Sequence, residues 1–375
     1  MQTGRLVAGQ LDPSLQLETM QLETMQLESV LLQWVNIGEI SPTAKHWLVA
    51  DLLTHRSCLE ALGIAAANAP DVVEQQLQQL LQVWSKVQSF CWQQLQWQTC
   101  PMATLWRLWL PLANWIQQRW QQHPPLFVQG ILGGQGTGKS TLAALLAVIL
   151  SQWGLRVCRL SIDDLYLTYA ERLQLQAQDP RLKWRGPPGT HDIQLGLHVL
   201  QQLRSPNPNQ PIQIPRFDKS LHHGAGDRTQ SEVISAADIV LFEGWFVGLK
   251  PIDPQRFENA PPPILTERDR QFAKDNNDRL AAYLPLWEQL DSLIVLQPQD
   301  YRLSQQWRRQ AEQQMTASGR SGMQDAEIDE FVEYFWRSLH PELFIPALLQ
   351  QPGAVDLVIE VQPDHTPGRV YRPQT

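Results

Sequence analysis

The sequence carries a glycine-rich loop of the type that cradles phosphate groups. Residues 133–140 read GGQGTGKS and fit the pattern GxxxxGK[ST]. Glycines allow a tight turn whose backbone N–H groups point at phosphate oxygens, the Lys neutralises the β- and γ-phosphates, and the Ser hydroxyl ligates Mg²⁺. We therefore expect an ATP site formed by Gly133, Gly134, Gln135, Gly136, Thr137, Gly138, Lys139, Ser140 and Thr141.

Acidic residues follow two further apolar runs. SIDDLY ends one run with Asp163 and Asp164, and VLFEGW ends another with Glu243. Phosphoryl transfer needs a group that orients and deprotonates the acceptor hydroxyl, which a carboxylate can do. We expect Asp163 to be this base and Asp164 to cap a helix or assist a metal, but two adjacent carboxylates leave both assignments open. Glu243 is expected to hold Mg²⁺ or its waters together with Ser140.

A long insertion, residues 165–237, follows the first of these carboxylates. It contains eight Lys/Arg against six Asp/Glu, a balance of +2 in a chain whose net charge is −8. A locally positive segment beside an ATP site indicates an anionic acceptor. About half of its cations are expected to be ordinary solvated charges. With Asp163, the candidates for acceptor binding are Tyr166, Arg185, Thr190, His191, Arg216, Lys219 and Arg228.

Within the insertion, residues 184–192 read WRGPPGTHD. Two prolines and two glycines exclude a helix or a central strand. Thr190 or Asp192 can N-cap the helix that IQLGLHVLQQL begins. A rigid backbone here would let Arg185 and the helix start face a small anion.

Residues 301–323, YRLSQQWRRQAEQQMTASGRSGM, read as a basic helix that ends in a glycine-rich turn. Such a helix suits a lid that stabilises transferring charge and excludes water. Arg309 on the helix is our catalytic candidate beside Lys139, and Arg320 in the turn could act in the same way. The alternative is a solvated helix in which Glu312 pairs with Arg308 or Arg309.

Five short apolar runs, rich in β-branched residues, must position these groups. They alternate with helical or loop-rich stretches, which predicts an α/β fold with a doubly wound, five-stranded parallel sheet. Ligands of such sheets bind beyond the carboxyl ends of the strands, where the motifs above lie. The runs are LFVQGIL (126–132), LRVCRLS (155–161), DIVLFEG (238–244), DSLIVLQ (291–297) and VDLVIEV (355–361).

The N-terminal part differs in composition. Residues 15–29 contain a five-residue repeat, LQLETMQLETMQLES, which fixes no helical or strand face and reads as low-complexity sequence, helical at best. Residues 30–120 are rich in Gln, Leu and Trp at helical spacing. We expect an α-helical accessory region over 1–100 and a kinase-type domain over 101–375.

Composition excludes several classes of protein. With 43% hydrophobic residues, a net charge of −8 and a pI near 5.6, the chain reads as a globular protein that binds neither nucleic acid nor membrane. From its first residues we expect neither a secretory nor a transit signal. Its four cysteines form no CxxC motif, which favours free thiols in a reducing cytoplasm.

Six segments together resemble the plant- and cyanobacterial-type D-glycerate 3-kinases, within the wider P-loop group of phosphoribulokinase, uridine kinase and pantothenate kinase. The resemblance runs from about residue 100 to the end, on GGQGTGKST, SIDDLYLT, RGPPGTHD, IPRFDKSLHHGAGDR, LFEGW and WRRQAEQQMTASGRSGM. It implies ATP- and Mg²⁺-dependent phosphorylation of D-glycerate to 3-phosphoglycerate, the closing step of photorespiration. It also implies that Asp163 is the acceptor-activating residue, Glu243 the strand-end carboxylate, and Lys139 and Ser140 the nucleotide-binding pair.

Two alternatives remain open at this point. One is another small-molecule kinase of the same group, acting on uridine, ribulose 5-phosphate or pantothenate. The other is a non-catalytic, nucleotide-dependent switch that binds partners through its helical N-terminal half. The oligomeric state is left open by the sequence.

Overall fold

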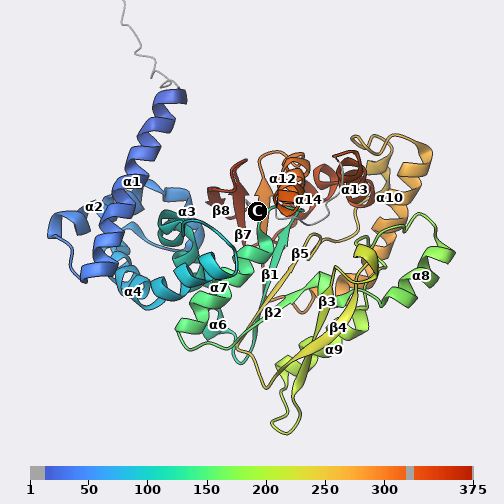
Figure 1. The fold of residues 1–375 in the computed structure, drawn as a ribbon, viewed down its shortest axis with the longest axis horizontal. Coiled ribbons are helices and arrows are strands. Elements are labelled where there is room, and N and C mark those ends of the chain that lie inside the picture. The colour runs from blue at the N-terminus through green and yellow to red at the C-terminus, as the bar shows by residue number, and fades with distance from the viewer. Residues whose placement is uncertain (1–12, 318–324, 374–375) are drawn as a thin grey trace, which may run out of the picture.

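The computed structural model describes residues 13–317 and 325–373. Its centre is a six-stranded sheet with the order β2–β5–β1–β6–β7–β8 (Figure 1). From β2 to β7 all neighbouring strands are parallel, which confirms the five predicted strands to within about two residues. The strands are β1 (Phe127–Gly133), β2 (Val157–Ser161), β5 (Ile239–Gly244), β6 (Ser292–Pro298), β7 (Leu357–Val361) and β8 (Pro367–Tyr371).

The sixth strand, β8, was not predicted. It pairs antiparallel with β7 at the edge of the sheet. Its sequence, PGRVY, begins with Pro and Gly, which the pattern rules assign to turns. An edge strand tolerates both residues, because one side of its backbone needs no partner in the ladder.

Both faces of the sheet are covered by helices, and successive residues of each parallel strand point to opposite faces. In β5, Ile239 and Leu241 join the hydrophobic cluster that contains α4, α6 and α7, whereas Val240 and Phe242 join the one that contains α9, α10, α11 and α14. This is the doubly wound arrangement that the buried apolar runs predicted. The helices over these faces are α6 (Leu110–Gln122), α7 (Lys139–Gln152), α9 (Ile193–Arg204), α10 (Glu267–Arg279), α11 (Leu284–Trp287) and α14 (Pro341–Leu349).

The insertion after β2 folds into α8 (Tyr169–Gln178), α9 and a separate antiparallel hairpin, β3 (Ile212–Asp218) with β4 (Asp227–Ile234). The hairpin extends away from the main sheet beside α9 (Figure 1). Most side chains of β4 are exposed or half-buried. A strand with so few buried residues leaves a weak apolar pattern, so this hairpin was not predicted from the sequence. Its turn returns the chain toward the end of β2.

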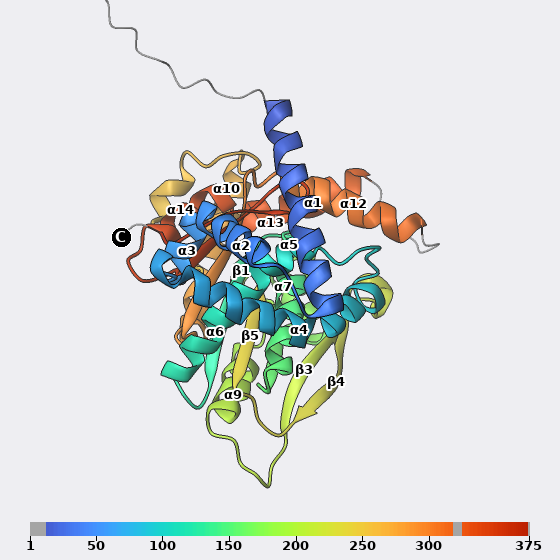
Figure 2. The same cartoon turned by 90° about the vertical axis from the view of Figure 1, so that its left-hand side faces the viewer.

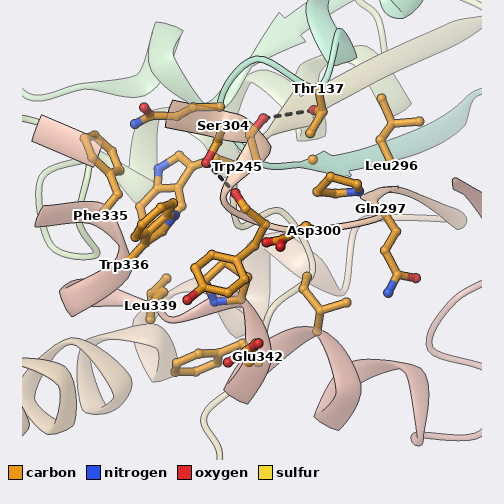
Figure 3. A pocket seen from close by; sticks show the side chains of 18 of the residues that line it. Thr137, Trp245, Leu296, Gln297, Asp300, Ser304, Phe335, Trp336, Leu339 and Glu342 are labelled. Atoms are coloured by element: carbon orange, nitrogen blue, oxygen red, sulfur yellow. Dashed lines mark hydrogen bonds between the residues drawn. The ribbon is translucent and has the colours of Figure 1, made fainter. Parts of the chain in front are cut away.

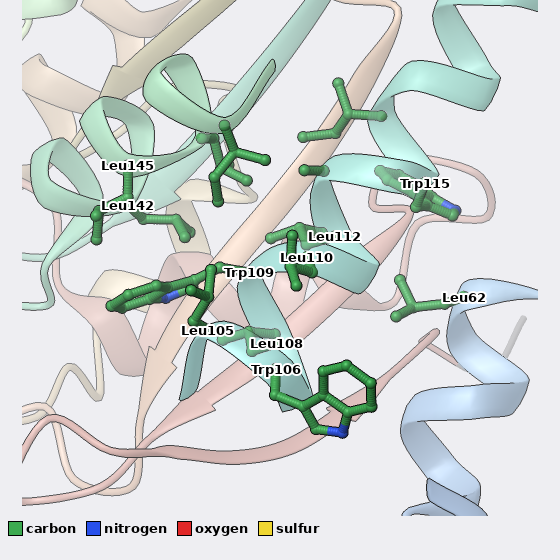
Figure 4. Packing of buried hydrophobic residues seen from close by; sticks show 14 of the residues in the cluster. Leu62, Leu105, Trp106, Leu108, Trp109, Leu110, Leu112, Trp115, Leu142 and Leu145 are labelled. Carbon is green, nitrogen blue, oxygen red and sulfur yellow. The ribbon is translucent and has the colours of Figure 1, made fainter. Parts of the chain in front are cut away.

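The N-terminal region is helical, as predicted, and packs on the α7 side of the sheet (Figure 2). One hydrophobic cluster runs without a break from Leu27 through α4 to Phe127 and Leu145. Trp106 and Trp109 lie in its centre and are 1% and 6% exposed (Figure 4). The helices are α1 (Pro13–Ile37), α2 (Pro42–Thr54), α3 (Arg56–Leu62) and α4 (Ala69–Gln93), followed by α5 (Met102–Thr104) and a π-helical segment (Leu105–Trp109) that run into α6.

The repeat at 15–29 lies within α1, so its sequence is helical. The predicted boundary at residue 100 falls in the loop between α4 and α5, but the hydrophobic cluster continues across it. The accessory region and the kinase-type domain therefore share a core. No helix of the described residues combines the length and apolarity that a membrane span requires.

Candidate active site

The glycine-rich loop joins β1 to α7, as its motif requires. Gly136 and Gly138 have φ values of 78° and 84°, which other residues adopt only with strain. A Cβ on Gly136 would lie 2.7 Å from the Cβ of Trp307, a residue of α12 (Leu303–Ala317). Lys139 is the first residue of α7, so the loop meets the positive end of that helix dipole. The loop has the geometry of a phosphate site.

Ser140 and Glu243 meet at the floor of this loop. The Ser140 hydroxyl donates to Glu243 Oε1 at 2.7 Å, and the Glu243 side chain is buried. Glu243 Oε2 is also buried but has no hydrogen-bond partner within the described residues. An unpartnered carboxylate oxygen beside a hydroxyl fits Mg²⁺, which prefers oxygen ligands. Across 13–317 and 325–373, no three His, Cys, Asp or Glu side chains gather as a metal site.

Asp163 lies beyond the carboxyl end of β2, in the 3₁₀ turn Ile162–Leu165. Its carboxylate pairs with Lys219 Nζ at 2.5 Å and interacts with the hydroxyl of Tyr166. Burial raises the pKa of Asp163, but Lys219, Tyr166 and the nearby Lys139 outweigh burial and leave the pKa at about 2. The structure therefore brings the proposed base, two cations and the glycine-rich loop to one edge of the sheet.

The neighbouring Asp164 has a different environment. Its carboxylate accepts from the backbone N–H of Ser161 at 3.0 Å, which completes a capping box, and pairs with Arg216 at 3.0 Å. Arg216 also pairs with Glu232 at 2.5 Å, so it ties the β3–β4 hairpin to the end of β2. Burial raises the pKa of Asp164. Asp164 is thus used as a cap, one of the two uses that the sequence left open.

Residues 184–192 form a loop whose conformation is fixed by hydrogen bonds and close packing. Asp192 N-caps α9 by accepting from Leu195 N–H at 2.9 Å. Thr190 closes the loop instead, because its hydroxyl donates to Pro187 O and accepts from Gly186 N–H. A Cβ on Gly186, whose φ is 131°, would lie 2.4 Å from the ring of Phe335. Only a glycine allows this contact.

All three arginines predicted to bind the acceptor contact protein atoms: Arg216 in the pairs with Asp164 and Glu232, and Arg185 and Arg228 as follows. Arg185 donates to the carbonyl oxygens of Gly224 and Ala225 at 2.7 and 3.0 Å, and its guanidinium lies 6.0 Å from the Tyr166 ring. Arg228 pairs with Asp192 at 3.0 Å and donates to Tyr166 O. Both bind the hairpin turn to the 184–192 loop and border Tyr166. Their roles toward the acceptor remain predictions.

The helix that we predicted to act as a lid is α12, and the glycine-rich turn with Arg320 lies outside the described residues. Arg309 pairs with Asp329 of α13 (Asp325–Ser338) at 2.6 Å. Arg308 pairs with Glu312, one of the two pairings expected for a solvated helix. The catalytic role of Arg309 remains a prediction.

A cavity of about 580 Å³ opens beside Gly136, Thr137 and Gly138. Its walls are Trp97 and Trp109, whose rings stack at 6.3 Å, and the β7–β8 loop with His365. Trp97, Trp109 and His365 are not among the site residues predicted from the sequence, because no local pattern indicates that the α4–α5 loop reaches the glycine-rich loop.

A second cavity, of about 320 Å³, lies at Gly133, Gly134 and Gln135 (Figure 3). Trp245, which follows β5, lines it together with Phe335 and other apolar residues of α13 and α14. Trp245 also donates from Nε1 to Gly186 O at 3.2 Å. This cavity therefore separates the glycine-rich loop from the aromatic residues that support the 184–192 loop.

Known proteins share this architecture. No protein-family model matches the chain. The uncharacterized kinase mug58 of Schizosaccharomyces pombe is 35% identical over 225 residues, which cover 56% of this chain and 78% of that kinase. The chain therefore belongs to this family of P-loop kinases. It is an enzyme of the kinase class, and its glycine-rich loop is the P-loop of the family.

Two further comparisons concern kinases with a named substrate. The chloroplastic D-glycerate 3-kinase of Arabidopsis thaliana is 29% identical over 289 residues, covering 71% of this chain and 61% of the plant protein. The structure of D-glycerate 3-kinase from Cryptococcus neoformans superposes with a TM-score of 0.64 at 29% identity, covering 71% of this kinase and 99% of the fungal chain.

Proposed function

We propose that this kinase transfers the γ-phosphoryl group of ATP to the 3-hydroxyl of D-glycerate, giving 3-phosphoglycerate and ADP. One observation carries the proposal: the Asp163–Lys219 ion pair lies beside the P-loop lysine. An acceptor with a hydroxyl and a carboxylate matches such a pair. The two D-glycerate 3-kinases that the chain resembles support the same acceptor.

Lys219 is the residue that would bind the carboxylate of an anionic acceptor. Its side chain is 61% exposed, so it is free to turn from Asp163 toward an incoming carboxylate. Without Lys219 beside it, Asp163 loses the cation that most lowers its pKa and becomes a stronger base. Binding of the acceptor carboxylate would thus activate the residue that receives the hydroxyl proton.

The reaction is an in-line displacement. The acceptor oxygen forms a bond to the γ-phosphorus, its proton passes to Asp163, and the bond to the ADP oxygen breaks with its electron pair. Lys139 and the N–H groups of the P-loop stabilise charge on the phosphates. Mg²⁺ on ATP would neutralise further phosphate charge, with Ser140 Oγ and Glu243 Oε2 as the protein groups suited to hold it.

We also propose that the cavity walled by Trp97, Trp109 and His365 takes the base of ATP, because it opens directly beside the P-loop and presents aromatic faces. The N-terminal region then forms part of the nucleotide site. All four cysteines are free, which supports action in a reducing compartment such as the cytoplasm.

ADP release over a panel of acceptors tests the proposal. We expect D-glycerate to exceed uridine, ribulose 5-phosphate and pantothenate in kcat/KM. A preference for any of these three would replace glycerate as the acceptor. ATP binding without acceptor-dependent ADP release would instead support a nucleotide-dependent switch.

A further inference from the structure

A buried histidine–tyrosine pair lies beside the proposed acceptor site. His191 of the 184–192 loop is 5% exposed, and Tyr283, at the end of the 3₁₀ turn Leu280–Tyr283, is 1% exposed. Nδ1 of His191 lies 2.7 Å from the Tyr283 hydroxyl. These two residues come from segments more than ninety positions apart, so only the fold brings them together.

The direction of this hydrogen bond follows from the other partners of Tyr283. The backbone N–H of Gly189 donates to the Tyr283 oxygen at 2.8 Å, and the backbone N–H of His191 is directed at the same oxygen. A phenol oxygen has one proton to give, and no other acceptor for it is found among the described residues. If Tyr283 donates to Nδ1, both atoms are satisfied. The reverse direction would leave the buried Tyr283 proton without a partner.

His191 must therefore carry its proton on Nε2. Burial lowers the pKa of His191 to about 3, against a smaller opposing effect of Asp163, so the ring is neutral. Nε2 is buried and has no hydrogen-bond partner in the part of the chain that the structure describes. An unpaired buried donor is unfavourable and is usually explained by a ligand or an ordered water.

The surroundings of His191 belong to the acceptor site. The Tyr166 ring stacks on the imidazole with centroids 4.5 Å apart, and the Tyr166 hydroxyl interacts with Asp163. Phe246 closes another side, with ring centroids 5.5 Å apart. These two ring contacts are aromatic and offer no acceptor to Nε2–H, and the charge of the proposed base Asp163 acts on the same imidazole.

We infer that His191 donates its Nε2–H to an oxygen of the acceptor other than the one phosphorylated, and that Tyr283 positions this donor by fixing the tautomer. The identity of the acceptor rests on the proposed function, where the 2-hydroxyl and the carboxylate of D-glycerate offer such oxygens. Tyr283 acts through His191 and is a positioning residue. An acceptor lacking a second oxygen next to the reacting hydroxyl would lose this contact.

A double-mutant cycle tests the inference. Tyr283→Phe frees the tautomer of His191, so we expect KM for D-glycerate to rise about 10-fold while KM for ATP stays within about 2-fold. His191→Gln keeps an N–H donor that needs no partner at Tyr283. In the His191→Gln background, Tyr283→Phe should therefore change KM for D-glycerate by less than about 2-fold. His191→Leu, which has no donor, should raise it on the order of 10- to 100-fold.

Tyr334→Phe is the matched control. Tyr334 is also a buried tyrosine, and its hydroxyl donates to Trp184 O of the same loop at 3.2 Å, without contacting His191. It should leave KM for D-glycerate within about 2-fold of wild type. Equal losses from Tyr283→Phe in both backgrounds would show that Tyr283 only supports the loop, and would overturn the inference.

The tautomer is measured independently of catalysis. In ¹⁵N NMR of ligand-free wild type, His191 should show a protonated Nε2 and a bare Nδ1. A proton on Nδ1, or on both nitrogens at pH 7, would overturn the inference even where a variant fails to fold. If wild type does not phosphorylate D-glycerate, the proposed acceptor fails, whereas this spectrum still decides the pairing of Tyr283 with His191.

Discussion

Asp163→Asn and Asp164→Asn form a matched pair that separates catalysis from structure. The residues are adjacent, and each substitution keeps the shape of the side chain while removing its charge. Asp163 faces Lys219 and the P-loop lysine, whereas Asp164 completes a cap and pairs with Arg216. We expect Asp163→Asn to abolish most activity and Asp164→Asn to preserve it.

The expected size of the effect on turnover follows from the role of a base. A positioned general base contributes about 10²- to 10⁴-fold, or about 2.7–5.4 kcal/mol of activation free energy. Asp163→Asn should lower kcat by this factor. Asp164→Asn leaves the acceptor hydroxyl, the P-loop and Lys219 in place, so its kcat should stay within about 10-fold of wild type.

The two variants should also differ in stability. The pKa of Asp163 falls from 3.8 to about 2 on folding, which at 1.36 kcal/mol per unit corresponds to about 2.4 kcal/mol in favour of the ionised form. Because this pKa is depressed, the contribution is present above about pH 4 and is lost as pH falls toward 2. Asp163→Asn should therefore cost up to about 2 kcal/mol at pH 7.

For Asp164, the contribution to stability has the opposite dependence on pH. Its pKa is raised by burial, so any stabilisation from this shift is present at low pH and is lost as pH rises through the folded pKa. At pH 7 the charge itself is unfavourable, and the pairing with Arg216 offsets part of that cost. The free energy of unfolding of Asp164→Asn should thus lie within about 1 kcal/mol of wild type.

Coupled ADP-release assays at saturating ATP and D-glycerate give kcat, and urea unfolding at pH 7 gives the free energy of unfolding. Both variants must be folded under the assay conditions. If Asp164→Asn removed activity while Asp163→Asn retained it, the base would be Asp164 and the assignment above would be wrong.

Three further outcomes are expected. Lys219→Met removes the cation that lowers the pKa of Asp163, so this pKa rises and the acidic limb of the kcat/KM pH profile moves to higher pH. An acidic limb at the wild-type pH would show that Lys219 does not control the pKa of Asp163. Glu243→Gln keeps an acceptor for Ser140 but removes a charge, so half-saturating Mg²⁺ should rise about 10-fold in a metal titration; an unchanged requirement would remove Glu243 from the metal site. Trp97→Ala should raise KM for ATP about 10-fold and leave KM for D-glycerate unchanged, whereas the reverse pattern would place the nucleotide base elsewhere.

The sheet was predictable because its central parallel strands are buried on both faces, whereas β2, at the edge, is buried at alternate positions. β1 and β5 are buried at every position, and such continuous apolar runs are visible in sequence. The strands β3 and β4 were not predictable, because a two-stranded hairpin with many exposed side chains gives no comparable apolar pattern. Its position matters for function, since the turn between these strands carries Lys219 to Asp163.

The site residues that lie at the ends of strands were predictable from the sequence. The P-loop, Asp163 and Glu243 each lie at the carboxyl end of a parallel strand, and the topology alone brings them together. Trp97 and Tyr283 do not lie at the end of a predicted strand, so nothing in the sequence assigns them to the site. They enter the site because distant helices pack on the sheet, and a single sequence does not state which distant segments meet.

In the WRGPPGTHD segment, the roles of individual residues depend on contacts with distant parts of the chain. Its backbone is fixed by groups far along the chain: Phe335 fills the space at Gly186, Trp245 donates to Gly186 O, and the Tyr283 hydroxyl accepts from Gly189 N–H. Thr190 was predicted to bind the acceptor, but in the structure its hydroxyl closes the loop by donating to Pro187 O. The one side chain of the segment left with an unpartnered buried donor is His191, so the loop is rigid in order to aim that donor.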